Sequence, residues 1–296
     1  MKKKIQIIGV PMDLGQPHRG VDMGPGAIRY ADLSGRLKKL GHTIHDLGNI
    51  QAPVRDSLPA GPGNSFLPAI QTVCEEVYQA GRKAVEQGFF PLFLGGDHSI
   101  AIGSIGGITH QEPAGVIWVD AHGDFNTPET SGSGNVHGMP LAILMGTGPT
   151  ELVNVGRKGP KLGSRDVVLI GIRDLDPEER SRLVASGITV YTMRDIDERG
   201  MGAIAREALK KLGHRRRIHL SLDVDSLDPI ESPGVGTPVP GGLTYREAQL
   251  LMEILADSQR VASLDIVEIN PILDHRNQTA RTAVELTASV FGKSII

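Results

Sequence analysis

The sequence predicts an α/β protein built around a central, mostly parallel sheet of about eight strands. Two features of the 296 residues lead to this prediction. Short runs of β-branched, aliphatic and aromatic residues alternate with longer helix-like segments, which is typical of a parallel sheet covered by helices on both faces. Many of the 37 glycines also come just after these runs, where loops turn tightly beside a site.

The expected strands are short apolar runs bounded by glycine, proline or charged residues, as buried parallel strands are. They cover residues 5–10, 43–47, 89–94, 115–119, 167–172, 188–192, 218–220 and 263–269. The expected helices lie near residues 65–87, 177–186, 196–212, 244–257 and 277–291. The helix near 244–257 opens with a capping box, in which Thr244 caps the first turn and Glu247 stands three residues on.

Length and composition suit one large domain, which would span residues 1–296, or two small ones. A hydrophobic content of 40% is enough for one large core, and no stretch resembles a linker. The formal net charge is −3, and dense basic clusters occur only at residues 2–4 and 215–217. Nucleic acid is therefore not an expected partner.

The sequence also bears on the compartment. No run approaches the roughly 18 apolar residues of a membrane-spanning helix, and the segment after the N-terminal lysines is too short and broken for a signal peptide. The single cysteine, Cys74, permits no intrachain disulfide, which fits a reducing compartment. We expect a cytoplasmic protein without a membrane partner, in which Cys74 contributes only to packing.

Three polar stretches carry the residue types that bind metal ions, and each comes directly after an expected strand. They are Gly-Gly-Asp-His-Ser at 95–99, Asp-Ala-His-Gly-Asp at 120–124 and Ser-Leu-Asp-Val-Asp at 221–225. Ligands bind at the carboxyl ends of parallel strands, so the three stretches can converge there. Residues two apart on an extended chain point the same way, which aims each stretch at one site. The candidate ligands are His98, Asp120, His122, Asp124, Asp223 and Asp225.

A single aspartate at a strand end is more often a helix cap or a turn former than a metal ligand. The combination of Asp-x-His-x-Asp and Asp-x-Asp is different, because five ionisable side chains directed inward would repel one another or stay desolvated without a cation. Together with His98, these residues predict a metal centre that is large enough for two divalent ions.

The ligand types indicate the metal. Four carboxylates and two imidazoles favour Mn²⁺ first, with Co²⁺, Fe²⁺ and Zn²⁺ as competitors, and Cys74 lies too far away to supply a thiolate. Carboxylates can bridge two ions, and bridged ions about 3.5–4 Å apart generate hydroxide near neutral pH and stabilise a hydrolytic transition state. The expected chemistry is hydrolysis.

A loop rich in serine and glycine, residues 125–139, leaves the second candidate ligand stretch and returns to His137. Such a composition ordinarily indicates a solvated, flexible loop. Here we expect its neutral donors to hold a polar substrate beside the metals, and His137 has a pKa range that suits a proton shuttle. Glu268 ends another strand among apolar residues, and the residues alone leave open whether it is salt-bridged inside the fold or faces a cationic substrate. The acids at 174–179 also fit a helix N-terminus.

Six motifs, in this order, resemble those of the ureohydrolase family and, within it, the bacterial arginases. They are Gly-Gly-Asp-His-Ser, Asp-Ala-His-Gly-Asp-Phe-Asn-Thr, Ser-Gly-Asn-Val-His-Gly-Met-Pro, Ser-Leu-Asp-Val-Asp-Ser-Leu-Asp-Pro, Gly-Thr-Pro-Val-Pro-Gly-Gly-Leu and Val-Glu-Ile-Asn-Pro. The resemblance runs from Ile8 almost to the end of the chain. It implies a three-layer α/β/α fold, two Mn²⁺ per subunit and a homo-oligomer, a trimer or a hexamer. The implied reaction converts L-arginine and water to L-ornithine and urea by attack of a metal-bridging hydroxide on the guanidinium carbon.

The resemblance also implies a role for each motif residue. One manganese would be held by His98, Asp120, Asp124 and Asp223, and the other by Asp120, His122, Asp223 and Asp225. Asp124 would orient the hydroxide, His137 would shuttle protons, and Glu268 would lie beside the substrate guanidinium. The implied substrate-binding residues are Asn126, Ser131 and Ser133 at the α-carboxylate, Asp176 and Glu179 at the α-amino group, and Thr237 in the same pocket.

Other functions stay open at this point. An agmatinase or another amidinohydrolase would share the metal centre, and the loop from Asn126 to Ser133 discriminates, because agmatine has no α-carboxylate to bind there. A metal-dependent deacetylase of related fold would normally need a single zinc. A non-catalytic regulator that binds metal or arginine is the alternative outside enzymes, and a urea assay on the purified protein would separate it from a hydrolase.

Overall fold

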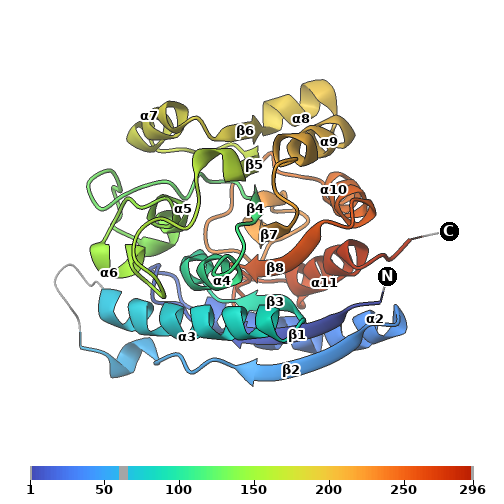
Figure 1. The fold of residues 1–296 in the computed structure, drawn as a ribbon, viewed down its shortest axis with the longest axis horizontal. Helices are drawn as coiled ribbons and strands as arrows, with labels where there is room; N and C mark the ends of the chain where they lie inside the picture. The colour runs from blue at the N-terminus through green and yellow to red at the C-terminus, as the bar shows by residue number, and fades with distance from the viewer. Residues whose placement is uncertain (1, 60–65, 295–296) are drawn as a thin grey trace.

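A single parallel sheet is the centre of the molecule. The structure is a computed structural model that describes residues 2–59 and 66–294, and within these ranges eight strands pair in the order β2-β1-β3-β8-β7-β4-β5-β6 (Figure 1). All seven neighbouring pairs run parallel, so the carboxyl ends of all the strands lie at one edge. The strands are β1 Lys4–Val10, β2 Thr43–Asn49, β3 Phe90–Gly95, β4 Gly115–Val119, β5 Val167–Ile172, β6 Thr189–Thr192, β7 Ile218–Asp223 and β8 Val261–Val267.

Helices cover both faces of this sheet and give the three layers that the resemblance implies. In Figure 1 the sheet runs from β2 at the bottom to β6 at the top, with one helical layer on each side. One layer contains α1 Gly24–Tyr30, α2 Leu33–Lys39, α8 Met193–Arg199, α9 Met201–Lys211, α10 Tyr245–Asp257 and α11 Gln278–Val290. The other contains α3 Leu67–Glu86, α4 Ala101–Ile108, α5 Pro140–Leu144, α6 Thr150–Val153 and α7 Pro177–Ser186.

Alternation along the central strands separates the two cores. On β7, Ile218, Leu220 and Leu222 pack into the core beneath α9, α10 and α11. The intervening residues face the other layer, and Asp223 continues this series at the end of the strand. Because successive side chains of a strand point to opposite faces, the same alternation that buries the core also directs Asp223 to a fixed side of the sheet.

The expected fold class and all eight expected strands are confirmed, with shifted ends. The expected strand at 263–269 is β8, which begins and ends two residues earlier. Its extended conformation stops because Glu268 has a φ of 64°, in the left-handed region. The capping box at Thr244 is confirmed, since the Thr244 hydroxyl accepts from the Glu247 backbone N–H and the Glu247 carboxylate accepts from the Thr244 N–H.

One predicted helix is wrong as a single element. The segment expected as one helix near 196–212 forms α8 and α9, which meet at Gly200. Gly200 has a φ of 80°, which ends α8 and turns the chain. The helix expected near 65–87 is α3, and residue 65 itself lies outside the described residues.

Five helices have no counterpart among those expected: α1, α2, α4, α5 and α6. The helix α4 shows why, because every one of its residues is buried and it therefore has no polar face with helical periodicity. Its glycines allow close contact with α3: a Cβ on Gly103 would lie 2.3 Å from the Cys74 carbonyl oxygen. Cys74 itself is fully buried on α3, as expected for a packing residue.

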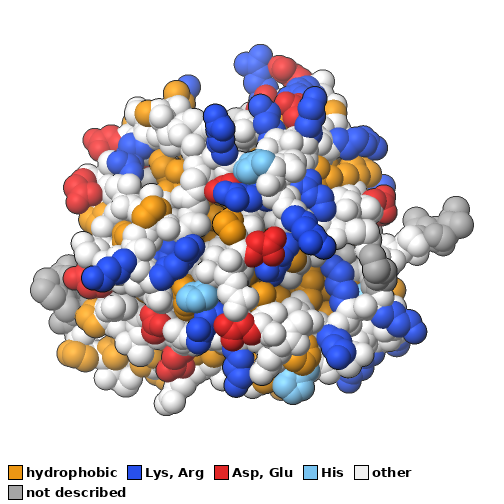
Figure 2. Space-filling view, viewed as in Figure 1, with side chains coloured by type: hydrophobic (Ala, Val, Ile, Leu, Met, Phe, Trp, Pro, Cys, Tyr) orange, Lys and Arg blue, Asp and Glu red, His pale blue; other side chains and the backbone are white. Residues whose placement is uncertain are grey.

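The surface carries both signs of charge. On the face shown in Figure 2, lysine and arginine side chains are interspersed with acidic and hydrophobic ones. Among the helices of the described residues, none is long and apolar enough to cross a membrane.

Candidate metal centre

Three strands at the centre of the sheet supply the candidate ligands. These strands are β3, β7 and β4. β8 lies between β3 and β7, and β4 is the other neighbour of β7, so the carboxyl ends of the three strands lie near one another. His98 follows β3 in a short 3-10 turn, Asp223 is the last residue of β7, and Asp225 lies in the next 3-10 turn, Val224–Ser226. Asp120, His122 and Asp124 come after the end of β4 at Val119. The expected convergence of the three stretches at one edge is therefore present in the structure.

The local geometry after β4 differs from the expected extended chain. The chain bends at Ala121 and His122, and Asp124 adopts a φ of 49°. The Asp120 N–H still donates to the Ile170 carbonyl at 3.1 Å, and the Ala121 carbonyl accepts from the Arg173 N–H at 2.9 Å, so these two residues stay attached to the neighbouring segment of the sheet. Asp120 and Asp124 both approach His98 although residues 120–124 are not an extended strand.

The first ligand group surrounds one ring nitrogen of His98. Its Nδ1 lies 3.2 Å from Asp120 Oδ2, 3.0 Å from Asp124 Oδ2 and 3.1 Å from Asp223 Oδ2. The other nitrogen, Nε2, is 2.9 Å from the Ser221 hydroxyl. One N–H cannot satisfy three carboxylates, and His98 Nδ1 and Asp124 Oδ2 are both buried without a hydrogen bond. Ligand atoms about 2.1 Å from one octahedral ion lie roughly 3 Å apart, so this spacing fits a divalent cation.

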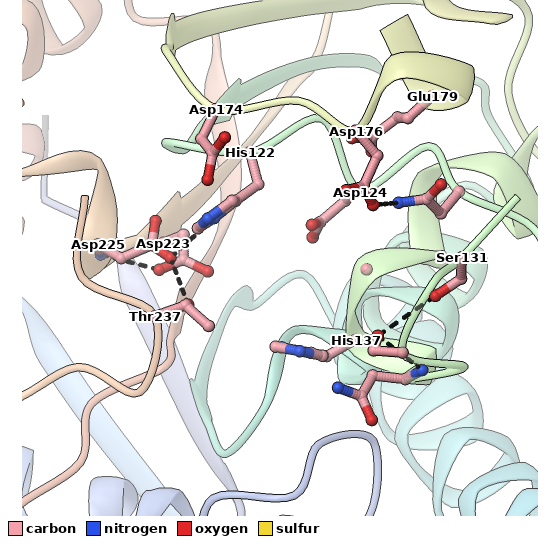
Figure 3. Close-up of a pocket in the computed structure, with 14 residues that line it drawn as sticks. His122, Asp124, Ser131, His137, Asp174, Asp176, Glu179, Asp223, Asp225 and Thr237 are labelled. Carbon is pink, nitrogen blue, oxygen red and sulfur yellow. Dashed lines mark hydrogen bonds and ion pairs between the residues drawn. The ribbon is translucent and has the colours of Figure 1, made fainter.

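The second ligand group is centred on His122. Its Nδ1 lies 3.1 Å from Asp225 Oδ2 and 3.4 Å from Asp120 Oδ1. His122, Asp223 and Asp225 point toward one another at one end of the cavity in Figure 3. Asp120 belongs to both groups. A carboxylate shared between two groups is the arrangement that a pair of bridged ions requires.

The alternative interpretation of these aspartates as turn formers also holds in part. Asp120 Oδ1 accepts from the His122 N–H at 2.7 Å, and Asp223 Oδ1 accepts from the Asp225 N–H at 2.8 Å. Asp225 Oδ1 accepts from the Ala121 N–H at 3.2 Å. In each case one oxygen of the carboxylate holds the backbone and the other faces a histidine. Each of these aspartates is therefore both a turn former and a candidate ligand.

The pKa values of the clustered aspartates indicate that positive charge would stabilise them. Burial raises the pKa of Asp223 well above its usual value, and the neighbouring Asp225 and Asp120 carboxylates raise it further. Burial and the Asp120 carboxylate likewise raise the pKa of Asp124 to about 6, although His98 opposes them. Buried carboxylates that repel one another in this way are stabilised by cations. The residues present thus fit a divalent metal centre.

A cavity of about 280 Å³ opens beside the second ligand group. All six residues that were expected to bind substrate line it, together with His137 (Figure 3). These six are Asn126, Ser131, Ser133, Asp176, Glu179 and Thr237. Thr237 donates to Asp225 Oδ2 at 3.1 Å, which ties this side of the cavity to the second ligand group.

Hydrogen bonds hold the polar loop on the other side of the cavity. Asn126 Nδ2 donates to Asp176 Oδ2 at 3.0 Å, and the Phe125 N–H donates to Glu179 Oε1 at 2.8 Å. The Ser131 hydroxyl accepts from the Gly134 N–H at 2.9 Å. Burial raises the pKa of Glu179 to about 7, despite the Phe125 N–H. The loop is therefore attached to the N-terminal turn of α7, and this part of the expected solvated loop is fixed.

His137 and Glu268 form a pair. His137 Nδ1 lies 3.0 Å from Glu268 Oε1, and the exposed fractions of the two side chains are 15% and 2%. Burial disfavours the charged imidazole, but the Glu268 carboxylate outweighs it and raises the pKa of His137 to about 9. Of the two possibilities left open by the sequence, Glu268 is paired inside the fold, yet it is paired with a residue that lines the cavity.

Asp174, one of the acids that also fit a helix N-terminus, lines the cavity and follows β5, so it obeys the same strand-end rule as the candidate ligands. Two other residues of the site were not predicted from the sequence. Arg173 donates to the carbonyl oxygens of Asp225, Ser226 and Leu227, and so fixes the turn that carries Asp225. Gln16 donates to Glu268 from a position 252 residues away in the chain. No sequence pattern signals a contact of that separation.

The chain matches a family model over nearly its whole length. The model of the "Arginase family" matches residues 3–292. The arginase of Bacillus subtilis strain 168 is 51% identical to this chain over 298 residues, with full coverage of both chains.

Solved structures give the same relationship in three dimensions. The native structure of the arginase of Bacillus caldovelox has a TM-score of 0.96 and 50% sequence identity, and covers 99% of this chain and 100% of its own. The arginase of Entamoeba histolytica, solved in complex with L-ornithine, has a TM-score of 0.90 and 31% identity, and covers 99% of each chain.

Proposed function

This chain belongs to the arginase family, and we propose that it hydrolyses L-arginine to L-ornithine and urea at a centre of two manganese ions. Family membership makes it a hydrolase of the guanidino group of arginine. The observation that carries the finer proposal is the placement of three buried carboxylate oxygens 3.0–3.2 Å from His98 Nδ1, where His98 Nδ1 and Asp124 Oδ2 have no hydrogen-bond partner.

Six residues would hold the two ions. His98, Asp124, Asp120 and Asp223 would bind one, and His122 and Asp225 would bind the other together with Asp120 and Asp223. The oxygen-rich set with two imidazoles suits manganese. When bound, a pair of such ions activates water as a nucleophile and stabilises the charge of a hydrolytic transition state.

The chain's own residues orient the substrate. The Glu268 carboxylate carries negative charge because His137 and the His98 N–H hold its pKa below the usual value against the effect of burial. A fixed carboxylate can position a guanidinium by charge-assisted hydrogen bonds, which lowers the entropic part of the barrier. The E. histolytica arginase is solved with L-ornithine, and we place the same amino-acid portion of the substrate against the loop that carries Asn126 and Ser131.

We assign proton transfer to His137 and the orientation of the attacking water to Asp124. The bond between His137 Nδ1 and Glu268 fixes the ring and leaves Nε2 to exchange a proton with the cavity. Because its pKa is about 9, the imidazole is protonated at neutral pH and can donate to the leaving amine of ornithine. Asp124 Oδ2 faces His98 in the first ligand group, and we assign the orientation of the attacking water to the other oxygen of this carboxylate.

The loop donors predict how the protein separates L-arginine from agmatine. Replacement of both Asn126 and Ser131 by alanine is expected to raise KM for L-arginine by about 10²-fold or more, because each of the two lost hydrogen bonds to a charged group is worth about 1.5–3 kcal/mol. KM for agmatine, which has no α-carboxylate, is expected to change less than about threefold. Steady-state kinetics with both substrates and a measurement of bound manganese test this.

The matched control is Ser181→Ala. Ser181 is an exposed serine of α7 whose hydroxyl donates to the Pro177 carbonyl, and it is not among the cavity-lining residues. Its loss is expected to leave both KM values unchanged. Equal increases in KM for the two substrates in the double variant would assign the loop a structural role and favour the agmatinase alternative.

A further inference from the structure

Glu268 is held in an unusual backbone conformation next to His137, which lines the cavity. Its φ of 64° is uncommon for a residue with a side chain and persists only where the surroundings fix it. The Glu268 N–H donates to the Gly96 carbonyl at 2.9 Å. On the side chain, Oε1 accepts from the His98 N–H at 2.9 Å and contacts His137. This accounts for one carboxylate oxygen but leaves Oε2 to be fixed by something else.

That second oxygen is bound by Gln16. Gln16 Nε2 donates to Glu268 Oε2 at 2.5 Å, and Gln16 is 2% exposed. The amide oxygen of Gln16 has no hydrogen-bond partner, and a Cβ on Gly236 would lie 2.9 Å from it. The Gln16 amide therefore donates to the Glu268 carboxylate, although its own oxygen is left without a hydrogen bond. Gln16 is not among the residues that line the cavity beside the metal ligands.

The segment that carries Gln16 is itself fixed at three points. Arg55 Nη2 donates to the carbonyl oxygens of both Asp13 and Gln16, and its guanidinium lies 5.3 Å from the centre of the Phe66 ring. The Gly15 N–H donates to Asp97 Oδ2 at 2.8 Å. These contacts hold residues 13–16 from outside the cavity.

The same segment also holds His137. The His137 N–H donates to the Gly15 carbonyl at 3.1 Å. Only glycine fits at this position, since a Cβ on Gly15 would lie 2.7 Å from Asp97 Oδ1 and 2.8 Å from the Ser99 hydroxyl. Residues 13–16 therefore contact the backbone of one member of the His137–Glu268 pair and the side chain of the other.

We propose that Gln16 is a positioning residue that fixes the Glu268 carboxylate for the substrate guanidinium, and that residues 13–16 align Glu268 with His137. The kinetic part of this inference rests on the proposed hydrolysis of L-arginine. Gln16 acts through Glu268, because its donor nitrogen is occupied by that carboxylate. Loss of the donor releases Oε2 and lets the carboxylate turn away from His137.

A double-mutant cycle with Glu268 tests the proposal. Gln16→Met keeps the length of the side chain without its donor, and Gln16→Asn keeps an amide that is too short to reach. Each is expected to lower kcat/KM for L-arginine by about 10- to 100-fold, mainly through kcat, because misplacement of a reacting group by about 1 Å can cost that much. In a Glu268→Gln background the same changes are expected to cost less than about twofold, since residues that act through one another are not additive.

The matched control is Gln249→Met. Gln249 is also a buried glutamine. It lies on α10, its Nε2 donates to the Ser289 hydroxyl at 2.6 Å, and it is not among the residues that line the cavity. It is expected to lower the thermal midpoint without changing kcat/KM. Bound manganese per chain is measured for every variant and is expected to match the wild type.

A crystal structure of Gln16→Met provides a readout that does not depend on activity. We expect the Glu268 carboxylate to leave its position, so that the 3.0 Å contact with His137 Nδ1 is lost. If the carboxylate stays in place, or if the Gln16 effect is the same in both backgrounds, the proposal is overturned. Failure of the proposed function would instead appear as a wild-type protein that releases no urea, and the crystal structure would still decide the role of Gln16.

Discussion

Replacement of Asp223 by asparagine is expected to lower kcat/KM for L-arginine by about 10³-fold or more and to reduce the manganese bound per chain. Asp223 approaches His98 in the first ligand group and lies two residues from Asp225 in the second. A bridging ligand serves both ions, and metal activation supplies several kcal/mol of transition-state stabilisation, each 1.36 kcal/mol being tenfold in rate. Metal analysis after dialysis, together with steady-state kinetics, measures both effects.

The comparison variant is Asp225→Asn, which removes a contact of the second ligand group alone. It is expected to be milder in both metal content and rate. Equal and mild losses in the two variants would contradict the bridging role of Asp223. Full activity of the wild type with one ion per chain would contradict the proposal of two ions.

Replacement of His137 by alanine is expected to lower kcat by about 10² to 10⁴-fold, the usual scale of general acid–base catalysis, with bound manganese unchanged. The reason is that the variant loses the imidazole that Glu268 keeps protonated beside the cavity. Residual activity is expected because activation of water does not depend on this side chain.

The control for His137 is His110→Ala. His110 also pairs with another side chain, since its Nδ1 lies 2.6 Å from the Tyr78 hydroxyl, but it is at the end of α4 and away from the cavity. It is expected to leave kcat unchanged. Complete loss of activity in His137→Ala with both metals bound would show that His137 does more than move protons.

The fold and the candidate ligands were accessible from the sequence because both depend on local patterns. Buried parallel strands leave continuous apolar runs, and acids that follow such runs necessarily lie at one edge of the sheet. This reasoning places His98 and Asp223 at the edge of the sheet where the structure has them. It does not describe the chain from Asp120 to Asp124, because the bend and the positive φ of Asp124 depend on packing that no periodicity records.

Features that depend on contacts between distant segments could not be predicted from the sequence. The helix α4 is buried on all sides, so its sequence has no amphipathic pattern to detect. Gln16 and Glu268 meet only because β1 and β8 both neighbour β3 in the sheet. Residues of this kind contribute to the site through the topology of the sheet, and the chain order alone gives no signal for them.

The most direct test of the proposed function is urea release by the purified, manganese-loaded chain from L-arginine, agmatine, guanidinobutyrate and formiminoglutamate in parallel. L-arginine is expected to be hydrolysed to urea and L-ornithine with a kcat/KM about 10² times that for agmatine or more, because agmatine has no α-carboxylate to accept hydrogen bonds from Asn126 and Ser131. Hydrolysis of agmatine as fast as or faster than L-arginine would contradict the proposed function and establish the agmatinase alternative.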